Sequence, residues 1–280
     1  MTRLRLVTRV MRRLKRTLVS TVLKSLDVAY SIPGVLDPLR LVSLSSRAVP
    51  PALFACVYRY KNAAVVERLV AQCAHSNIQT KLWALDKTHP DLASVTVGEG
   101  PGFRFALLNR LLENAPADNW LVISDDDVRF GQRGIATLLR TCDRFGFGLA
   151  QPAHARVRSH YSYRMTLRKS WRLARETTFV EIGPVVVIAP SAREGMVPFP
   201  EEGMGWGVEL LWYDRHLAGL RIGVIDVSPV RHLSPGGRDY DWSSENERLL
   251  RLLAERNLES MRDVQHTIRS VRWPGGTKEV

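Results

Sequence analysis

The sequence predicts an α/β protein built on a mostly parallel sheet with helices on both of its faces. Short apolar runs, of the kind that buried strands require, alternate with amphipathic helical segments over residues 52–123. Two of these runs end at an acidic side chain, Asp86 and Asp125, and ligands bind at the carboxyl ends of strands in such sheets. A chain of 280 residues that is 45% hydrophobic is long enough to bury one large core.

Local pattern predicts each element of the first half. Apolar runs short enough to be buried strands cover residues 53–58, 81–85 and 120–123. Apolar residues spaced by three and four predict a helix that begins after Asn62, whose side chain can cap it. A second helix is expected over residues 103–112.

The second half has a less regular pattern. Residues 154–176 form a basic stretch with interleaved tyrosine and tryptophan. After it we expect a strand over residues 179–189 that Gly183-Pro184 interrupts, and a helix over 208–217 that follows a glycine-rich turn. A further strand over 220–227 and a charged terminal helix over 243–266 complete the prediction.

A basic arm precedes the predicted sheet. Residues 1–24 hold eight Lys and Arg and no acid, out of a formal net charge of +12 for the whole chain. Apolar residues in the arm recur on one helical face, which is typical of a helix that lies on an anionic membrane surface. The alternative is a helix that packs on the protein itself with a solvated basic face. Charges interrupt every apolar run in the arm, so we expect neither a signal peptide nor a membrane span there.

These features divide the chain into three parts and suggest a compartment. We expect a basic arm with a connector over residues 1–48, a catalytic domain over 49–240 and a helical extension over 241–280. The three cysteines are widely spaced and odd in number, which fits a reducing cytoplasm better than a disulfide framework. We therefore predict a cytoplasmic protein, peripheral at the inner membrane face if residues 1–26 bind lipid.

Three consecutive acids, Asp125, Asp126 and Asp127, follow the apolar strand that ends at residue 123. Like charges this close repel one another, and burial at the end of a strand adds a desolvation cost. A divalent cation relieves both costs, and hard oxygen ligands suit Mn²⁺ or Mg²⁺. The triplet therefore predicts a metal site, with a solvated acidic turn as the alternative.

Residues 123–128 resemble the Asp-x-Asp motif of GT-A-fold glycosyltransferases, in the style of the family 2 nucleotide-sugar transferases. The resemblance spans roughly residues 52–235 and implies a GT-A-type, Rossmann-like, mostly parallel sheet flanked by helices. The basic N-terminal helical arm and the C-terminal helix lie outside the resemblance and are predicted from pattern alone. The resemblance also implies that Asp127 is the stronger metal ligand, and that Asp125 lies near the metal and the donor. Asp126 is grouped with the donor-binding residues, although its own role is left open.

Residues 205–209 resemble the Trp-Gly-x-Glu/Asp segment of several GT-A families. The resemblance places Trp206 and Gly207 at the nucleotide sugar and makes Glu209 the acid that faces the acceptor. A carboxylate there can take the proton of an acceptor hydroxyl or orient the acceptor; the alternative is a favourable charge in a first helical turn. His232 stands where many GT-A enzymes recruit a further metal ligand, although a lone histidine is often an ordinary polar residue.

The nucleotide side is carried by a weaker resemblance. Residues 55–62 resemble the first strand and turn of family 2 enzymes but lack the usual proline at the strand end. The resemblance implies base contacts from Tyr58, Arg59 and Asp86, and a basic contact from Arg104 before the helix expected over 103–112.

The implied function is a metal-dependent transfer of sugar from a nucleoside diphosphate sugar, UDP- or GDP-type, to a hydroxyl acceptor that is lipid-linked or anionic. A nucleotidyltransferase is one alternative, but the turn at residues 58–62 has no glycine for a triphosphate loop. A nucleic-acid-binding module is another, with bases stacked along residues 154–175. Nucleic acid is the less expected partner.

Overall fold

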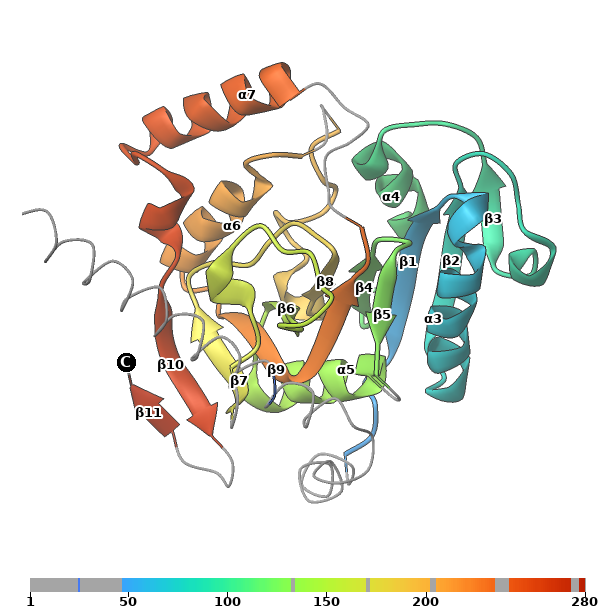
Figure 1. Ribbon diagram of the computed structural model, residues 1–280, viewed down its shortest axis with the longest axis horizontal. Coiled ribbons are helices and arrows are strands. Elements are labelled where there is room, and N and C mark those ends of the chain that lie inside the picture. The colour runs from blue at the N-terminus through green and yellow to red at the C-terminus, as the bar shows by residue number, and fades with distance from the viewer. Residues whose placement is uncertain are drawn as a thin grey trace, which may run out of the picture.

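One eleven-stranded sheet forms the centre of the protein in this computed structural model, which describes Ser25 and residues 47–131, 134–169, 172–201, 205–234, 242–272 and 277–279 (Figure 1). The strand order is β11-β10-β7-β9-β6-β8-β4-β1-β2-β3, with β5 paired to β9 off this path. The basic arm and the connector up to residue 46, Ser25 apart, lie outside the described residues, so the predictions for them stay predictions.

The first half confirms the predicted alternation. Its four strands are mutually parallel in the order β3-β2-β1-β4, and they are β1 (Ala52–Tyr58), β2 (Gln79–Ala84), β3 (Thr96–Glu99) and β4 (Trp120–Ser124). Its helices are α3 (Ala63–His75) and α4 (Arg104–Leu112), with single 3-10 turns at η1 (Tyr60–Asn62) and η2 (Pro90–Leu92). Strand β3 was absent from the prediction, because its alternating Thr-Val-Gly-Glu pattern is only half-buried.

The second half makes the sheet mixed. Its elements as far as the last long strand are β5 (Val128–Phe130), α5 (Gly134–Phe145), β6 (Leu149–His154), η3 (Arg164–Thr166), β7 (Arg172–Thr177), β8 (Val185–Ile188), η4 (Pro190–Ala192), α6 (Val208–Leu217) and β9 (Ile222–His232). Strand β8 is antiparallel to both β4 and β6, whereas β6 and β9 are parallel. Strands β3, β2, β1, β4, β6 and β9 therefore share one direction, and the central sheet is mostly parallel around β8.

The strand expected over residues 179–189 is shorter than predicted. Only β8, after Gly183-Pro184, joins the ladder. Pro184 has no N–H to donate, so pairing cannot run through it. The residues before it form a loop that enters the functional cleft.

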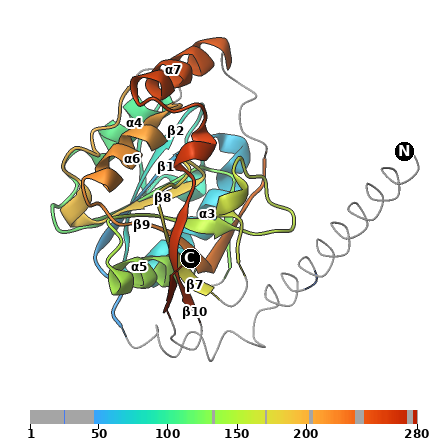
Figure 2. The ribbon, with the colours of Figure 1, turned by 90° about the vertical axis from the view of Figure 1, so that its left-hand side faces the viewer.

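The C-terminal part is not helical throughout. Helix α7 (Trp242–Glu255) ends eleven residues before residue 266, the predicted end (266 − 255 = 11), close to Asn257 in the left-handed conformation. After η5 (Met261–Val264), β10 (Thr267–Arg272) pairs antiparallel with β7, and β11 (Thr277–Glu279) pairs with β10. The chain runs from α7 down the sheet edge as these strands (Figure 2). The purely helical extension predicted for residues 241–280 is therefore wrong over β10 and β11.

The basic stretch 154–175 is partly interior. Arg175 is fully buried, and its guanidinium donates to both carboxylate oxygens of Asp226 at 2.8 and 3.1 Å. Arg168 is also buried. The Arg175–Asp226 ion pair joins β7 to β9, and its bidentate hydrogen bonds offset the cost of burying two charges. Arg164 is exposed, and Lys169 and Arg172 are half-buried. The acceptor loop or nucleic-acid surface predicted for the whole stretch therefore lacks Arg168 and Arg175.

Within the part of the chain that the structure describes, no helix combines the length and the apolar character needed to cross a membrane.

Candidate active site

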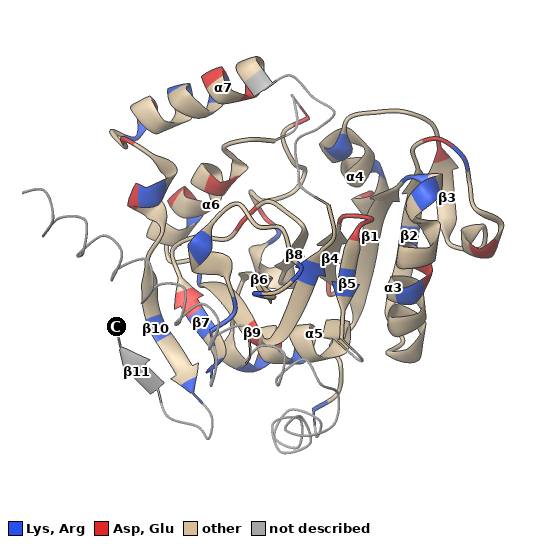
Figure 3. Ribbon diagram, viewed as in Figure 1, with Lys and Arg blue, Asp and Glu red and all other residues tan. Residues whose placement is uncertain are grey.

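A large cleft of about 1750 Å³ opens where β1, β2 and β4 end. Acidic ribbon segments lie beside the ends of β1 and β4 (Figure 3). Ten of the eleven predicted site residues line this cleft, namely Arg59, Asp86, Arg104, Asp125, Asp126, Asp127, Trp206, Gly207, Glu209 and His232. The structure thus brings together residues that are up to 173 positions apart in sequence (232 − 59 = 173).

The ladder between β5 and β9 places His232 beside the acidic triplet. Val128 pairs directly with His232, and the Leu233 N–H donates to the Asp127 carbonyl at 2.9 Å. The His232 Nε2 then lies 3.2 Å from Asp127 Oδ1. A backbone bond from Asp125 N to the Pro184 carbonyl, 2.8 Å long, fixes the start of the triplet.

The donor set of this cluster fits a divalent cation. One ligand atom each from Asp125, Asp127 and His232 lies within 4.8 Å of the other two. Burial works against the charged forms of Asp127 and His232, yet their mutual hydrogen bond lowers the pKa of Asp127 and raises that of His232. A metal ion would replace the proton that this pair shares. Two carboxylates with one imidazole suit Mn²⁺ well.

Asp126 points away from that cluster. Its Oδ2 accepts the Arg59 N–H at 2.8 Å, and the Asn62 side chain also bonds to it. Burial raises the pKa of Asp126. Asn62 stands at the start of α3 but makes no capping bond with its side chain, so the predicted cap is wrong. Asp126 instead joins the turn after β1 to the turn after β4.

Two other predicted nucleotide contacts, Asp86 and Arg104, also line the cleft. The Asp86 Oδ1 accepts the N–H groups of Tyr60 and Lys87, which hold the pKa of Asp86 below its usual range. Arg104, at the first position of α4, forms an ion pair with Asp125 at 2.7 Å. The guanidinium thus reaches the edge of the acidic cluster.

Tyr58 is a core residue. Its side chain is fully buried, and its hydroxyl lies 3.1 Å from Thr96 Oγ1 and accepts the His89 N–H at 3.1 Å. Strand alternation turns it inward while Arg59 faces the cleft. The prediction that Tyr58 contacts the nucleotide is therefore wrong.

The glycine-rich turn places Glu209 in the first turn of α6. Gly207 precedes the helix with φ of 90°, a conformation that favours glycine, and a side chain there would strike Leu252 of α7. The Glu209 carboxylate accepts the Ile182 N–H at 3.3 Å and is only 6% exposed. Burial raises the pKa of Glu209 to about 7. A carboxylate with such a pKa is suited to proton transfer near neutral pH.

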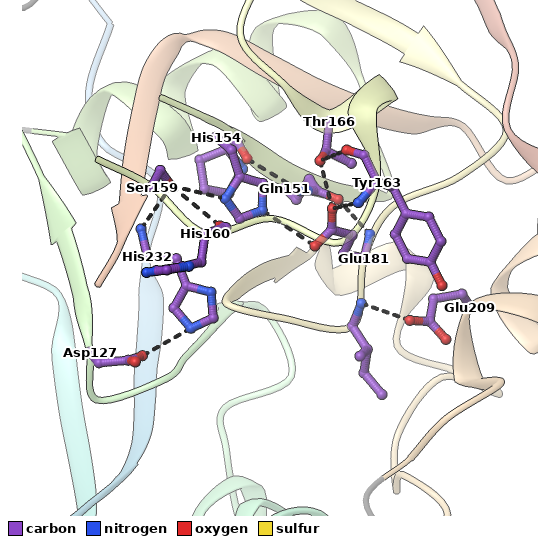
Figure 4. Close-up of polar contacts among 12 residues, drawn as sticks. Asp127, Gln151, His154, Ser159, His160, Tyr163, Thr166, Glu181, Glu209 and His232 are labelled. Atoms are coloured by element: carbon purple, nitrogen blue, oxygen red, sulfur yellow. Dashed lines mark hydrogen bonds and ion pairs between the residues drawn. The ribbon is translucent and has the colours of Figure 1, made fainter. Parts of the chain in front are cut away.

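A buried polar network, absent from the sequence prediction, joins the two halves of the site (Figure 4). The Ser159 hydroxyl accepts the His232 N–H at 3.0 Å and lies 3.4 Å from His154 Nδ1. His154 Nε2 lies 3.4 Å from Glu181 Oε2, and the loop at residues 160–163 lines the cleft above. Sequence offered one weak signal for it, a histidine at the end of an apolar run at residues 149–154.

No protein-family model and no curated protein matches this sequence. Solved structures do match the fold. GalNAc-T7 with UDP, GalNAc and Mn²⁺ superposes at a TM-score of 0.52 and 9% identity, over 74% of this chain and 48% of that one. This chain therefore spans about half of the GalNAc-T7 length.

Residues 1–349 of S. aureus TarS also superpose at a TM-score of 0.52, with 12% identity over 75% of this chain and 66% of that one. The same TarS region in complex with UDP-GlcNAc gives 0.52 with 13% identity, over 75% and 67%. Strand order, the cleft at the strand ends and these superpositions agree, and the chain has the GT-A glycosyltransferase fold.

Proposed function

We propose that this protein is a metal-dependent glycosyltransferase that moves a sugar from a nucleoside diphosphate sugar to a hydroxyl acceptor. One observation carries the proposal. Asp125, Asp127 and His232 converge within 4.8 Å on one wall of a cleft that also holds the buried Glu209. Such an arrangement offers a cation site for a diphosphate and, separately, a base for an acceptor.

Each group has a chemical task in this proposal. Asp125, Asp127 and His232 would hold a divalent cation, which would supply positive charge for the leaving diphosphate. Arg104 adds a second positive charge beside Asp125. In an inverting transfer Glu209 accepts the proton of the acceptor hydroxyl, and the hydroxyl oxygen bonds to the anomeric carbon as the bond from that carbon to the diphosphate oxygen breaks and the nucleoside diphosphate leaves. The alternative task of Glu209 is to orient the acceptor.

The donor is proposed to be a UDP-type sugar. GalNAc-T7 was solved with UDP, and TarS with UDP and with UDP-GlcNAc. Asp86 binds the N–H groups of Tyr60 and Lys87 through its Oδ1, and in this proposal its Oδ2 accepts an N–H from the base. An acceptor that is lipid-linked or anionic, and membrane contact through residues 1–26, are proposals from sequence alone.

The rival functions are less supported. The turn after β1 has no glycine for a triphosphate, as a nucleotidyltransferase requires. Arg168 and Arg175 are buried, which removes two cations from the surface that a nucleic-acid module would use.

Metal-dependent thermal stabilisation tests the donor site. We expect UDP or a UDP-sugar with Mn²⁺ to raise the melting temperature, and the same nucleotide with EDTA to leave it unchanged. At a ligand concentration of about 100 times Kd the gain is about 2.7 kcal/mol, a shift on the order of 5 to 10 °C for a chain of this size. A nucleotide-sugar hydrolysis and transfer assay accompanies it. Equal stabilisation with and without metal would contradict the assigned cluster.

The pH profile tests Glu209. Because its pKa is raised to about 7, half of the molecules hold the ionised base at that pH. We expect kcat/KM to fall about tenfold per pH unit below the pKa, since only the ionised form accepts a proton. Initial rates from pH 5 to 9 in buffers of constant ionic strength measure it. An acid limb centred near pH 4.5, where an ordinary glutamate titrates, would argue against this role.

A further inference from the structure

One short loop, residues 181–184, touches three separate parts of the cleft. At its end, the Pro184 carbonyl accepts the Asp125 N–H at 2.8 Å, and a methyl group on Gly183 would lie 3.0 Å from Asp125 Oδ2. In its middle, the Ile182 carbonyl faces Arg104 Nη1 at 3.4 Å. The Ile182 N–H donates to Glu209. The backbone carbonyl and N–H of Ile182 thus connect Arg104, beside the acidic cluster, to Glu209.

The side chain of Glu181 anchors this loop from below. Its Oε1 accepts the Tyr163 N–H at 3.1 Å and lies 2.6 Å from the Thr166 hydroxyl. Its Oε2 lies 3.4 Å from His154 Nε2, and its own N–H donates to Gln151. Three hydrogen bonds, two to Oε1 and one from the backbone N–H, therefore hold Glu181, and the contact of Oε2 with His154 adds to them (Figure 4).

Glu181 and the side chains that bind it are buried. Glu181 is 6% exposed, while His154, Gln151 and Thr166 are fully buried. A buried carboxylate is costly unless all its oxygens are bonded. The bonds of Glu181 come from Gln151 on β6 and from Tyr163 and Thr166 at η3. A shift of the anchor would move Ile182 directly, because Ile182 is the next residue.

We propose that Glu181 is a positioning residue that sets the distance between Glu209 and the metal carboxylates by holding the loop at residues 181–184. The inference rests on the proposed glycosyl transfer. It assigns Glu181 a task apart from substrate contact, since a 1 Å misplacement of a reacting group costs rate without weakening the donor site.

Three variants test the proposal, with purified full-length protein, UDP-sugar and Mn²⁺. Glu181→Ala removes the anchor, and we expect kcat to fall on the order of 100-fold while the Mn²⁺-dependent nucleotide stabilisation stays unchanged. Glu181→Gln keeps the size of the side chain and the hydrogen bonds of Oε1. We therefore expect its kcat to lie within about fivefold of the wild-type value. Thr166→Val removes one contact to the anchor without touching the cleft wall, and a fall of about 3- to 10-fold is expected, the equivalent of one hydrogen bond.

Glu176 offers the matched control. It lies on β7, binds Arg221 and Arg269, and does not line the cleft. Glu176→Ala and Glu176→Gln should leave kcat unchanged. If Glu181→Ala does not fold, the kcat of Thr166→Val alone tests the proposal.

Three outcomes overturn the inference. A wild-type kcat in Glu181→Ala, or in Thr166→Val when the first variant is unfolded, shows that the anchor is dispensable. Equal losses in Glu181→Ala and Glu181→Gln show that the charge acts on substrate directly. Loss of nucleotide stabilisation together with kcat makes Glu181 a donor-binding residue. Failure of the proposed function is distinct, because wild type itself would then show neither metal-dependent nucleotide stabilisation nor transfer.

Discussion

Replacing Asp127 with alanine is expected to abolish nucleotide-sugar turnover, by a factor on the order of 10³ or more, because the charge that a metal supplies to a leaving group is worth several kcal/mol. Asp127 contributes to the cluster directly and also holds His232 at 3.2 Å. The variant thus loses a ligand and the partner that orients a second one. Transfer rate and the Mn²⁺-dependent thermal shift should fall together.

Two matched aspartate variants make this result specific. Asp126→Asn changes the neighbouring acid, whose carboxylate faces Arg59 N and Asn62 instead of the cluster. It should keep the Mn²⁺ dependence, although the β1 turn loses a charge-assisted bond. Asp143→Ala changes an exposed acid on α5 that does not line the cleft, and it should behave as wild type. Full activity in Asp127→Ala would refute the metal assignment.

Replacing Glu209 with glutamine should remove most of the transfer activity, on the order of 10² to 10⁴, the range that general base catalysis contributes. The amide keeps the size of the side chain and can still accept the Ile182 N–H. Metal-dependent nucleotide stabilisation should therefore persist. Transfer and nucleotide binding, measured on the same preparation, separate the two effects.

The pH dependence of the melting temperature tests the Glu209→Gln variant independently of its activity. Because burial raises the folded pKa of Glu209 to about 7, above that of an unfolded glutamate, the folded protein loses stability as pH rises between these values. The glutamine variant avoids this loss and should melt no lower than wild type at pH 8. Asp214→Asn, on the exposed side of α6 in an ion pair with Arg256, is the control. An unaltered transfer rate in Glu209→Gln would remove it as a base.

Local pattern was sufficient where a strand is buried on both sides. The runs that became β1 and β4 are apolar segments buried along nearly their whole length, so their burial could be predicted from sequence. Acids follow two of the predicted runs, Asp86 after β2 and Asp125 after β4, so the acidic strand ends could be predicted as well. Most of the predicted site residues then met in one cleft, because parallel strands end at a common edge.

The local sequence pattern gave wrong predictions where strand pairing or side-chain packing outweighs the local secondary-structure propensity. Residues 267–272 form strand β10 because they pair with the edge of β7. Their own sequence gives no signal of that partner. Tyr58 was assigned from the family resemblance and Asn62 from its residue type. Alternation along β1 turns Tyr58 into the core, and Asp126 binds the Asn62 side chain.

The sequence by itself determined the α/β class, the acidic end of β4 and the glycine-rich start of α6, since each depends on neighbours within a few residues. Only the tertiary structure decided that His232 would stand beside Asp127, that Asp126 would turn away, and that Glu209 would be buried with a pKa near 7. Those outcomes depend on strand register and on desolvation. Both are set by residues far apart in the chain, whose separation in space a sequence does not state.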